Sequence, residues 1–103
     1  MTDYYEKLDA KLYVADYNYD LGVASENRRA YSDATSYFQK AKNAYEDVRV
    51  CAIAIKDNDT FEHAKTRIRS CNVKVAENSN NYNAVKSDNP GLKHKNEYKV
   101  YTK

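Results

Sequence analysis

Apolar and aromatic side chains recur every three or four residues between residues 30 and 55, and no Gly or Pro interrupts them. This spacing places them on one side of an α-helix. A helix over these residues would be about 39 Å long, so it needs neighbouring helices along its full length to cover its apolar side. The stripe consists of Ala30, Tyr31, Ala34, Tyr37, Phe38, Ala41, Ala44, Tyr45, Val48, Cys51, Ala52 and Ile55.

A first helix is predicted over residues 3–26, and it carries apolar side chains on two adjoining faces. One stripe runs from Tyr5 to Val23. The second set consists of Tyr13, Tyr17, Leu21 and Ala24. So wide an apolar arc indicates either packing against more than one helix or a tyrosine-lined surface left for a partner. Gly22 costs this helix about 1 kcal/mol relative to Ala, and close contact with another helix is the expected reason for it.

Turn signals divide the chain into three helices. The first turn is predicted at Asn27–Arg29, because Asn tolerates the left-handed conformation that ends helices. The second turn follows the long stripe, where Asp59 together with Glu62 is expected to cap the next helix.

The third helix again keeps apolar residues at steps of three or four. It is predicted over residues 60–78, or as far as residue 85, because the polar segment 78–81 is poor helix-forming material. Residues 89–91, Asn-Pro-Gly, end any helix.

These patterns predict an all-α fold, a three-helix antiparallel bundle in up-down-up order. The bundle is expected to occupy residues 1–85, followed by a basic, flexible tail over residues 86–103. The tail carries five Lys against one Asp and one Glu. The alternatives for the tail are that Tyr98 to Tyr101 dock on the bundle or that the tail adds a short strand or helix. The predicted helices span residues 3–26, 30–56 and 60–78 or 60–85.

The composition indicates a thin core. Leu, Ile, Val and Phe number only 17 of 103 residues, whereas the chain has 11 Tyr and 12 Ala. Ala lets helices approach closely, and Tyr buries a large ring while its hydroxyl stays at a wet edge. Cys51 and Cys71 lie on apolar stripes and are expected to be reduced core residues, too far apart in this bundle for a disulfide.

Signals for catalysis are sparse. The chain has no glycine-rich phosphate loop, and its two histidines, His63 and His94, form no metal-binding pair with each other or with a cysteine. We therefore predict no catalytic residue, no cofactor and no metal site. The absence of a long apolar run or a signal peptide predicts a cytoplasmic protein with no membrane partner.

Residues of the first two helices resemble a tetratricopeptide repeat. Leucine-glycine in the first helix is followed at the family's spacing by Tyr, Ala, Phe and Ala in the second, and a shortened second copy begins 30 residues later. The chain departs from the family at Asn18, where an aromatic residue is expected, and it has no proline near Glu46. The repeat would require a break at residues 42–46, which the uninterrupted apolar stripe argues against. The residues that carry the resemblance are Leu21, Gly22, Tyr31, Ala34, Phe38 and Ala41.

The same Tyr-x-x-Ala-x-x-x-Phe-x-x-Ala run is similar to the second helix of the microtubule-interacting-and-trafficking domain. That resemblance implies a three-helix bundle with grooves beside its third helix, where partner peptide helices bind. Ile68, Cys71 and Val75 would lie near such a groove. The same spacings also suit any tightly packed helical bundle.

The function predicted from these observations is a non-catalytic protein-interaction module, with either a protein partner or self-association. Residues expected to contact the partner are Tyr13, Tyr17, Arg67, Tyr98 and Tyr101. The alternative is a nucleic-acid-binding accessory domain that uses Arg28, Arg29, Arg67, Arg69 and the Lys- and Tyr-rich tail. The net charge of only +2 does not favour that alternative.

Overall fold

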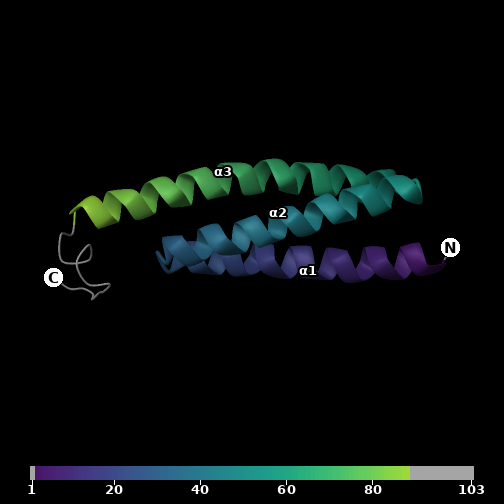
Figure 1. Ribbon diagram of the computed structural model, residues 1–103, viewed down its shortest axis with the longest axis horizontal. Coiled ribbons are helices and arrows are strands. Elements are labelled where there is room, and N and C mark those ends of the chain that lie inside the picture. Colours follow the sequence, from purple (N-terminus) through teal and green to yellow (C-terminus); the bar gives the residue numbers. More distant parts are fainter. Residues whose placement is uncertain (1, 89–103) are drawn as a thin grey trace.

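The computed structural model describes residues 2–88, with side chains from residue 5 to residue 85. Helices α1 (Thr2–Asn27), α2 (Tyr31–Ala54) and α3 (Asn58–Asp88) run up, down and up. Helix α2 packs along both neighbours, whereas the backbones of α1 and α3 lie farther apart and these two helices meet through side chains (Figure 1). The predicted all-α three-helix bundle is confirmed, and α2 passes through residues 42–46 without a turn.

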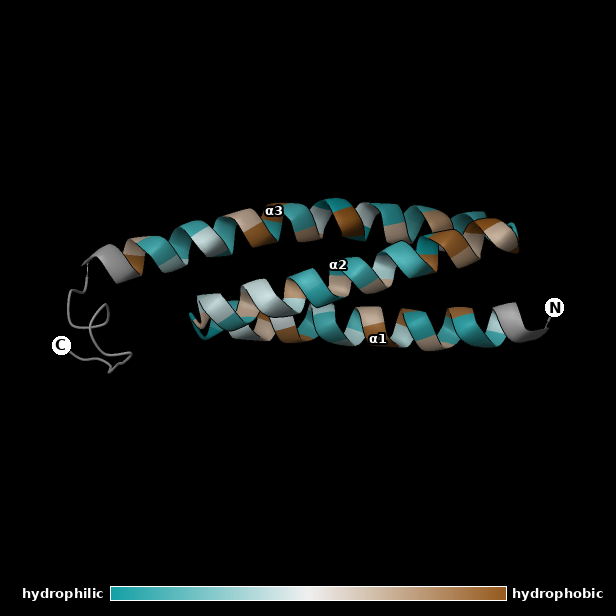
Figure 2. Cartoon of the chain, in the orientation of Figure 1, coloured by the Kyte–Doolittle hydropathy of each residue, from teal (hydrophilic) through white to brown (hydrophobic). Residues whose placement is uncertain are grey.

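Hydrophobic and hydrophilic residues alternate along all three helices, as Figure 2 shows. None of the helices in the described part of the chain is long and apolar enough to cross a membrane.

The core lies along the central helix and is built from few large side chains. Phe38, Tyr45 and Val48 of α2 are completely buried. Tyr19 of α1 meets Phe38 and Tyr45 edge-to-face, with ring centroids 5.3 Å and 6.4 Å apart. Apart from Leu8 and the two cysteines, the other buried core positions are alanines, as the composition predicted: Ala15, Ala34, Ala41, Ala52 and Ala64.

Gly22 lies directly against the ring of Phe38. A Cβ atom at residue 22 would be only 2.8 Å from the nearest ring carbon, closer than side chains approach one another. The expectation that close helix contact explains Gly22 is therefore confirmed.

Both turns are built in the same way, with a residue other than glycine in the left-handed conformation. Arg29 has φ 64° and Lys56 has φ 60°. In each turn the next amide donates to a carbonyl five residues back, from Ala30 to Ser25 at 2.8 Å and from Asp57 to Ala52 at 2.9 Å. This is the Schellman arrangement, in which Gly usually occupies the left-handed position.

The cap of α3 differs from the prediction of Asp59 with Glu62. The Asp57 carboxylate accepts hydrogen bonds from the Thr60 amide at 3.1 Å and from the Thr60 hydroxyl at 2.7 Å. These bonds hold the pKa of Asp57 below its usual value. The helix begins two residues earlier than expected because the turn closes at Lys56, which leaves Asp57 in the N-cap position.

Helix α3 continues to Asp88, beyond the predicted end at residue 78 or 85. Asn78 is completely buried, and its amide donates to the Glu26 carboxylate of α1 at 2.9 Å. Lys74 pairs with the same carboxylate at 3.0 Å, which raises the pKa of Lys74. These contacts with α1 outweigh the poor helix propensity of the asparagine-rich segment. The remainder of the predicted tail, residues 89–103, lies outside the described residues.

The two cysteines occupy separate core positions, as predicted. Cys51 and Cys71 are both buried, and neither forms a disulfide.

Gly22→Ala should destabilise the bundle, although Ala is the better helix former. The new methyl group would overlap the ring of Phe38, which is buried and cannot move aside. We expect the free energy of unfolding to fall by about 1–2 kcal/mol in urea titrations. In a Phe38→Leu background the same change should cost clearly less, and an equal cost in both backgrounds would contradict the contact.

Lys56→Gly should stabilise the bundle, because it removes a side chain from a left-handed residue. The expected gain is about 1 kcal/mol. Lys40→Gly, at an exposed position inside α2, is the matched control and should lose about 1 kcal/mol. A loss of stability in both variants would show that Lys56 is not strained.

Candidate functional site

The second apolar set predicted on the first helix lies on the outside of the bundle. Tyr13 is 70 % exposed, Val14 48 % and Tyr17 54 %. Leu21 is half-buried. We call this face the outer stripe, which consists of Ala10, Tyr13, Val14, Tyr17, Leu21 and Ala24. Two interpretations of the second apolar set were open, and the exposure of Tyr13 and Tyr17 favours a tyrosine-lined surface over a second core contact.

The two tyrosines of the outer stripe lie side by side. Their ring centroids are 6.1 Å apart, and their planes differ by only 8°. Their spacing of four residues accounts for this arrangement, because residues four apart lie on the same side of a helix. The pair therefore presents two nearly parallel aromatic rings to the surroundings.

A hollow beside the outer stripe separates α1 from α2. It has a volume of about 250 Å³ and is lined by Ala10, Lys11, Val14, Ala44 and Asp47. Lys11 pairs with Asp47 across it at 3.6 Å, and this ion pair is largely exposed. Two of the lining residues, Ala10 and Ala44, have small side chains, which leave this space between the helices unfilled. It could receive one side chain of a partner beside the aromatic pair.

Acidic side chains lie along one edge of the outer stripe. Asp9 comes four residues before Tyr13 and Asp20 three residues after Tyr17, so each lies on the same side of α1 as a tyrosine. Glu6 precedes Ala10 by the same four residues. All three carboxylates are exposed, and none of the ion pairs between described residues uses them.

Arg67, predicted to bind with these tyrosines, lies elsewhere. Its guanidinium group covers the ring of Tyr19 at 4.0 Å, between α1 and α3. Tyr17 and Tyr19 are two residues apart, and a helix turns by about 200° over that distance. Arg67 is thus not part of the outer stripe. Tyr98 and Tyr101 lie outside the described residues.

The arginines of the nucleic-acid alternative do not form one patch. Arg29 lies at the α1–α2 turn beside Tyr82 of α3, in the lining of one hollow. Arg69 is 13 residues from Tyr82 along α3, which corresponds to about 20 Å. Arg28 lies at the same turn as Arg29, and Arg67 points inward onto Tyr19.

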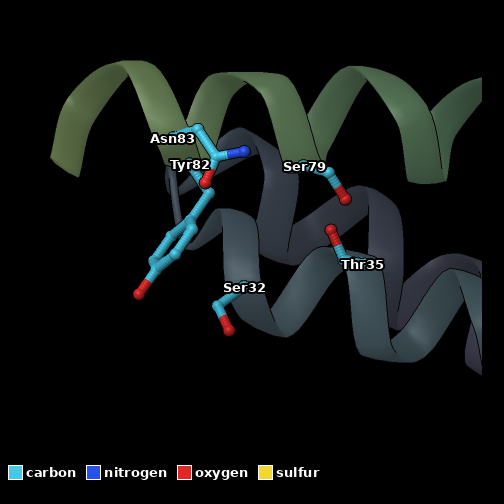
Figure 3. A pocket seen from close by; sticks show the side chains of 5 residues that line it. All are labelled: Ser32, Thr35, Ser79, Tyr82 and Asn83. Carbon is cyan, nitrogen blue, oxygen red and sulfur yellow. The ribbon is translucent and has the colours of Figure 1, made fainter. Parts of the chain in front are cut away.

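Another hollow lies between the start of α2 and the last turns of α3. Figure 3 shows that the hydroxyl groups of Thr35 and Ser79 face each other across it, while the ring of Tyr82 extends toward α2. Its volume is about 230 Å³, and Ser32 and Asn83 complete the lining. Thr35 already donates to the Tyr31 carbonyl at 3.0 Å. The lining offers hydrogen bonds but no charged group and no base beside a nucleophile, so it defines no reaction.

A polar group that the sequence did not reveal links all three helices. The Tyr45 hydroxyl of α2 donates to the Asp16 carboxylate of α1, and the His63 ring of α3 lies 3.5 Å from the same carboxylate. His63 also meets Tyr45 edge-to-face at 5.8 Å between ring centroids. Because Tyr45 is completely buried, its hydroxyl is closed to a substrate, and the group connects the helices.

These contacts join residues 29 and 47 positions apart, so no local spacing could have indicated them. The available signal was that Asp16 lies beside the core stripe of the first helix. Among the described residues, no group of three or more His, Cys, Asp or Glu side chains could hold a metal ion.

Comparisons with protein families, curated proteins and solved structures find no match to this chain.

The bundle should lose stability as the pH rises above about 9. Burial raises the pKa of Cys71 from 9.0 to about 11, and burial with the Asp16 hydrogen bond raises that of Tyr45 well above 10.0. In the unfolded chain both groups lose their protons at their ordinary pKa values. Their contribution to the free energy of unfolding is therefore complete below these values and is lost as the pH rises through the raised ones.

Urea midpoints measured from pH 7 to pH 11 test this expectation. Tyr45→Phe and Cys71→Ala should each make the alkaline loss less steep. Tyr13→Phe, at an exposed ring, is the control and should keep the parent slope. If stability falls with pH at the same slope in all three variants, other titrating groups cause the alkaline loss of stability.

Proposed function

We propose that this chain is a non-catalytic protein-interaction module and that the outer stripe of α1 is its docking surface. The observation that carries the proposal is the exposure of Tyr13, Val14 and Tyr17 on a helix whose opposite side already supplies the core. These side chains do not contribute to the core, and the exposure of their apolar surface to water is unfavourable. Aromatic residues are enriched at the centres of protein interfaces, where a few of them supply most of the binding energy.

The arrangement of the stripe suits a protein partner better than a small ligand. The aromatic pair lies on the exposed side of α1, and the hollow beside it is lined by only five residues, so a small molecule would stay largely in water there. The resemblance to the microtubule-interacting-and-trafficking domain also implies a protein partner, although that family binds peptide helices beside its third helix and not on its first. The proposal places the module in the cytoplasm, where Cys51 and Cys71 remain reduced.

A photo-reactive phenylalanine analogue at position 17 tests this proposal in the native host. It should cross-link a discrete partner, because Tyr17 lies at the centre of the outer stripe. The same analogue at Val73, an equally exposed position on α3, is the control and should not yield that product. Tyr13→Ala should reduce the product from position 17 by about 10-fold, as expected for the loss of an interface tyrosine.

Tyr13→Ala should leave the free energy of unfolding within about 0.5 kcal/mol of the parent value, because the ring is exposed. That measurement separates a lost contact from a lost fold. No product at position 17, or identical products at positions 17 and 73, would contradict the docking surface.

A further inference from the structure

We infer that the partner presents a basic amphipathic helix, whose apolar side chains cover the outer stripe while its Lys or Arg side chains contact the tyrosine pair and the acidic edge. This inference rests on the proposed function and adds the chemistry of the partner.

The spacing of the outer stripe favours a helix as the partner. Its apolar positions 10, 14, 17, 21 and 24 alternate steps of four and three residues, which is the heptad spacing of helix–helix contacts. The stripe is about 21 Å long, so a partner helix of about 14 residues would match it. The hollow between α1 and α2 lies beside Val14, where a side chain of such a helix would enter.

The charge of α1 favours a basic partner. The helix carries six Asp and Glu against two Lys. Asp16 and Glu26 lie against His63 and Lys74 of α3, so their charges serve the bundle itself. The carboxylates of Glu6, Asp9 and Asp20 remain exposed along the outer stripe. Cations on a partner would therefore meet three carboxylates that no described cation pairs with.

The aromatic rings support the same conclusion. Among the described residues, three other rings have a cation over their face: Tyr19 has Arg67 at 4.0 Å, Phe61 has Lys65 at 5.0 Å and Tyr37 has Lys40 at 5.6 Å. Within the described part of the chain, Tyr13 and Tyr17 have no such cation, although both are exposed. A Lys or Arg over either ring would add a cation–π contact to an ion pair with Asp9 or Asp20.

A second copy of the chain is a poorer occupant of this surface. Pairing two outer stripes would bring two acidic α1 helices together, and the exposed carboxylates of each would lie close to those of the other. Like charges at an interface oppose association.

Two designed peptides of 18 residues test the inference with the full chain. Both carry the same Leu and Ala residues at heptad positions, but one has Lys at every flanking position and the other has Glu. Dissociation constants would be measured by fluorescence anisotropy at low and at moderate salt. We expect the Lys peptide to bind at least about 10-fold more tightly than the Glu peptide, with affinity falling several-fold as salt rises.

Variants of the chain then locate the contact. Tyr13→Ala/Tyr17→Ala should weaken the Lys peptide by about 10-fold or more, whereas Tyr5→Ala, an exposed tyrosine outside the outer stripe, should not. Asp9→Asn/Asp20→Asn should remove most of the preference for Lys over Glu. Asp59→Asn/Glu77→Gln makes the same change in net charge on α3 and should keep that preference.

Each other result overturns the inference in a recognisable way. Equal binding of both peptides that depends on the tyrosines would leave the docking surface standing but remove its basic preference. If the tyrosine variants bind the Lys peptide as tightly as the parent chain does, the peptide is held by charge alone and not by the outer stripe. If neither peptide binds, and the chain sediments as a dimer that Tyr17→Ala converts to a monomer, the outer stripe is occupied by a second copy of the chain. If neither peptide binds and the chain sediments as a monomer, the outer stripe does not bind helices.

Discussion

The contact between the Phe38 ring and the backbone of Gly22 sets the distance between α1 and α2, and much of the bundle depends on that distance. Because α1 lies so close, the Tyr19 ring reaches both Phe38 and Tyr45, and its hydroxyl lies 2.6 Å from Ser70 on α3. A chain with so few large aliphatic residues cannot fill a wide gap between helices. Close approach therefore replaces bulk as the source of packing contacts.

The fold was largely predictable because apolar spacing reports which side of each helix is covered. The continuity of α2 followed from that spacing, and the role of Gly22 followed from the cost of glycine inside a helix. The start and end of α3 did not, because the start depends on the conformation of the preceding turn and the end on a contact between distant residues. Asp57 caps the helix only once the preceding turn has closed at Lys56, and Asn78 remains helical because its amide reaches Glu26 of α1.

The candidate site was predictable only in part, for a related reason. Tyr13 and Tyr17 were assigned to a possible partner surface because α1 has more apolar positions than one core contact needs. Arg67 was grouped with them by residue type, yet its place over Tyr19 depends on the rotation of α3 relative to α1. Spacing along one helix predicts neighbours on that helix, whereas contacts across helices require the packing itself. The acidic edge of the outer stripe needed no such packing and could have been found from spacing alone.

The position of α2 between its two neighbours in sequence has a kinetic consequence. Nearly all close approaches between helix backbones join consecutive helices, so the loops that must close during folding are short. Such local topologies fold quickly, and either outer helix can detach while the other remains paired with α2. Opening of α1 alone would break its contacts with α2 and the side-chain contacts of Asp16, Tyr19 and Glu26 with α3, and with them the hollow between α1 and α2. A partner bound across that hollow would slow this opening, and amide hydrogen exchange in α1 would report it.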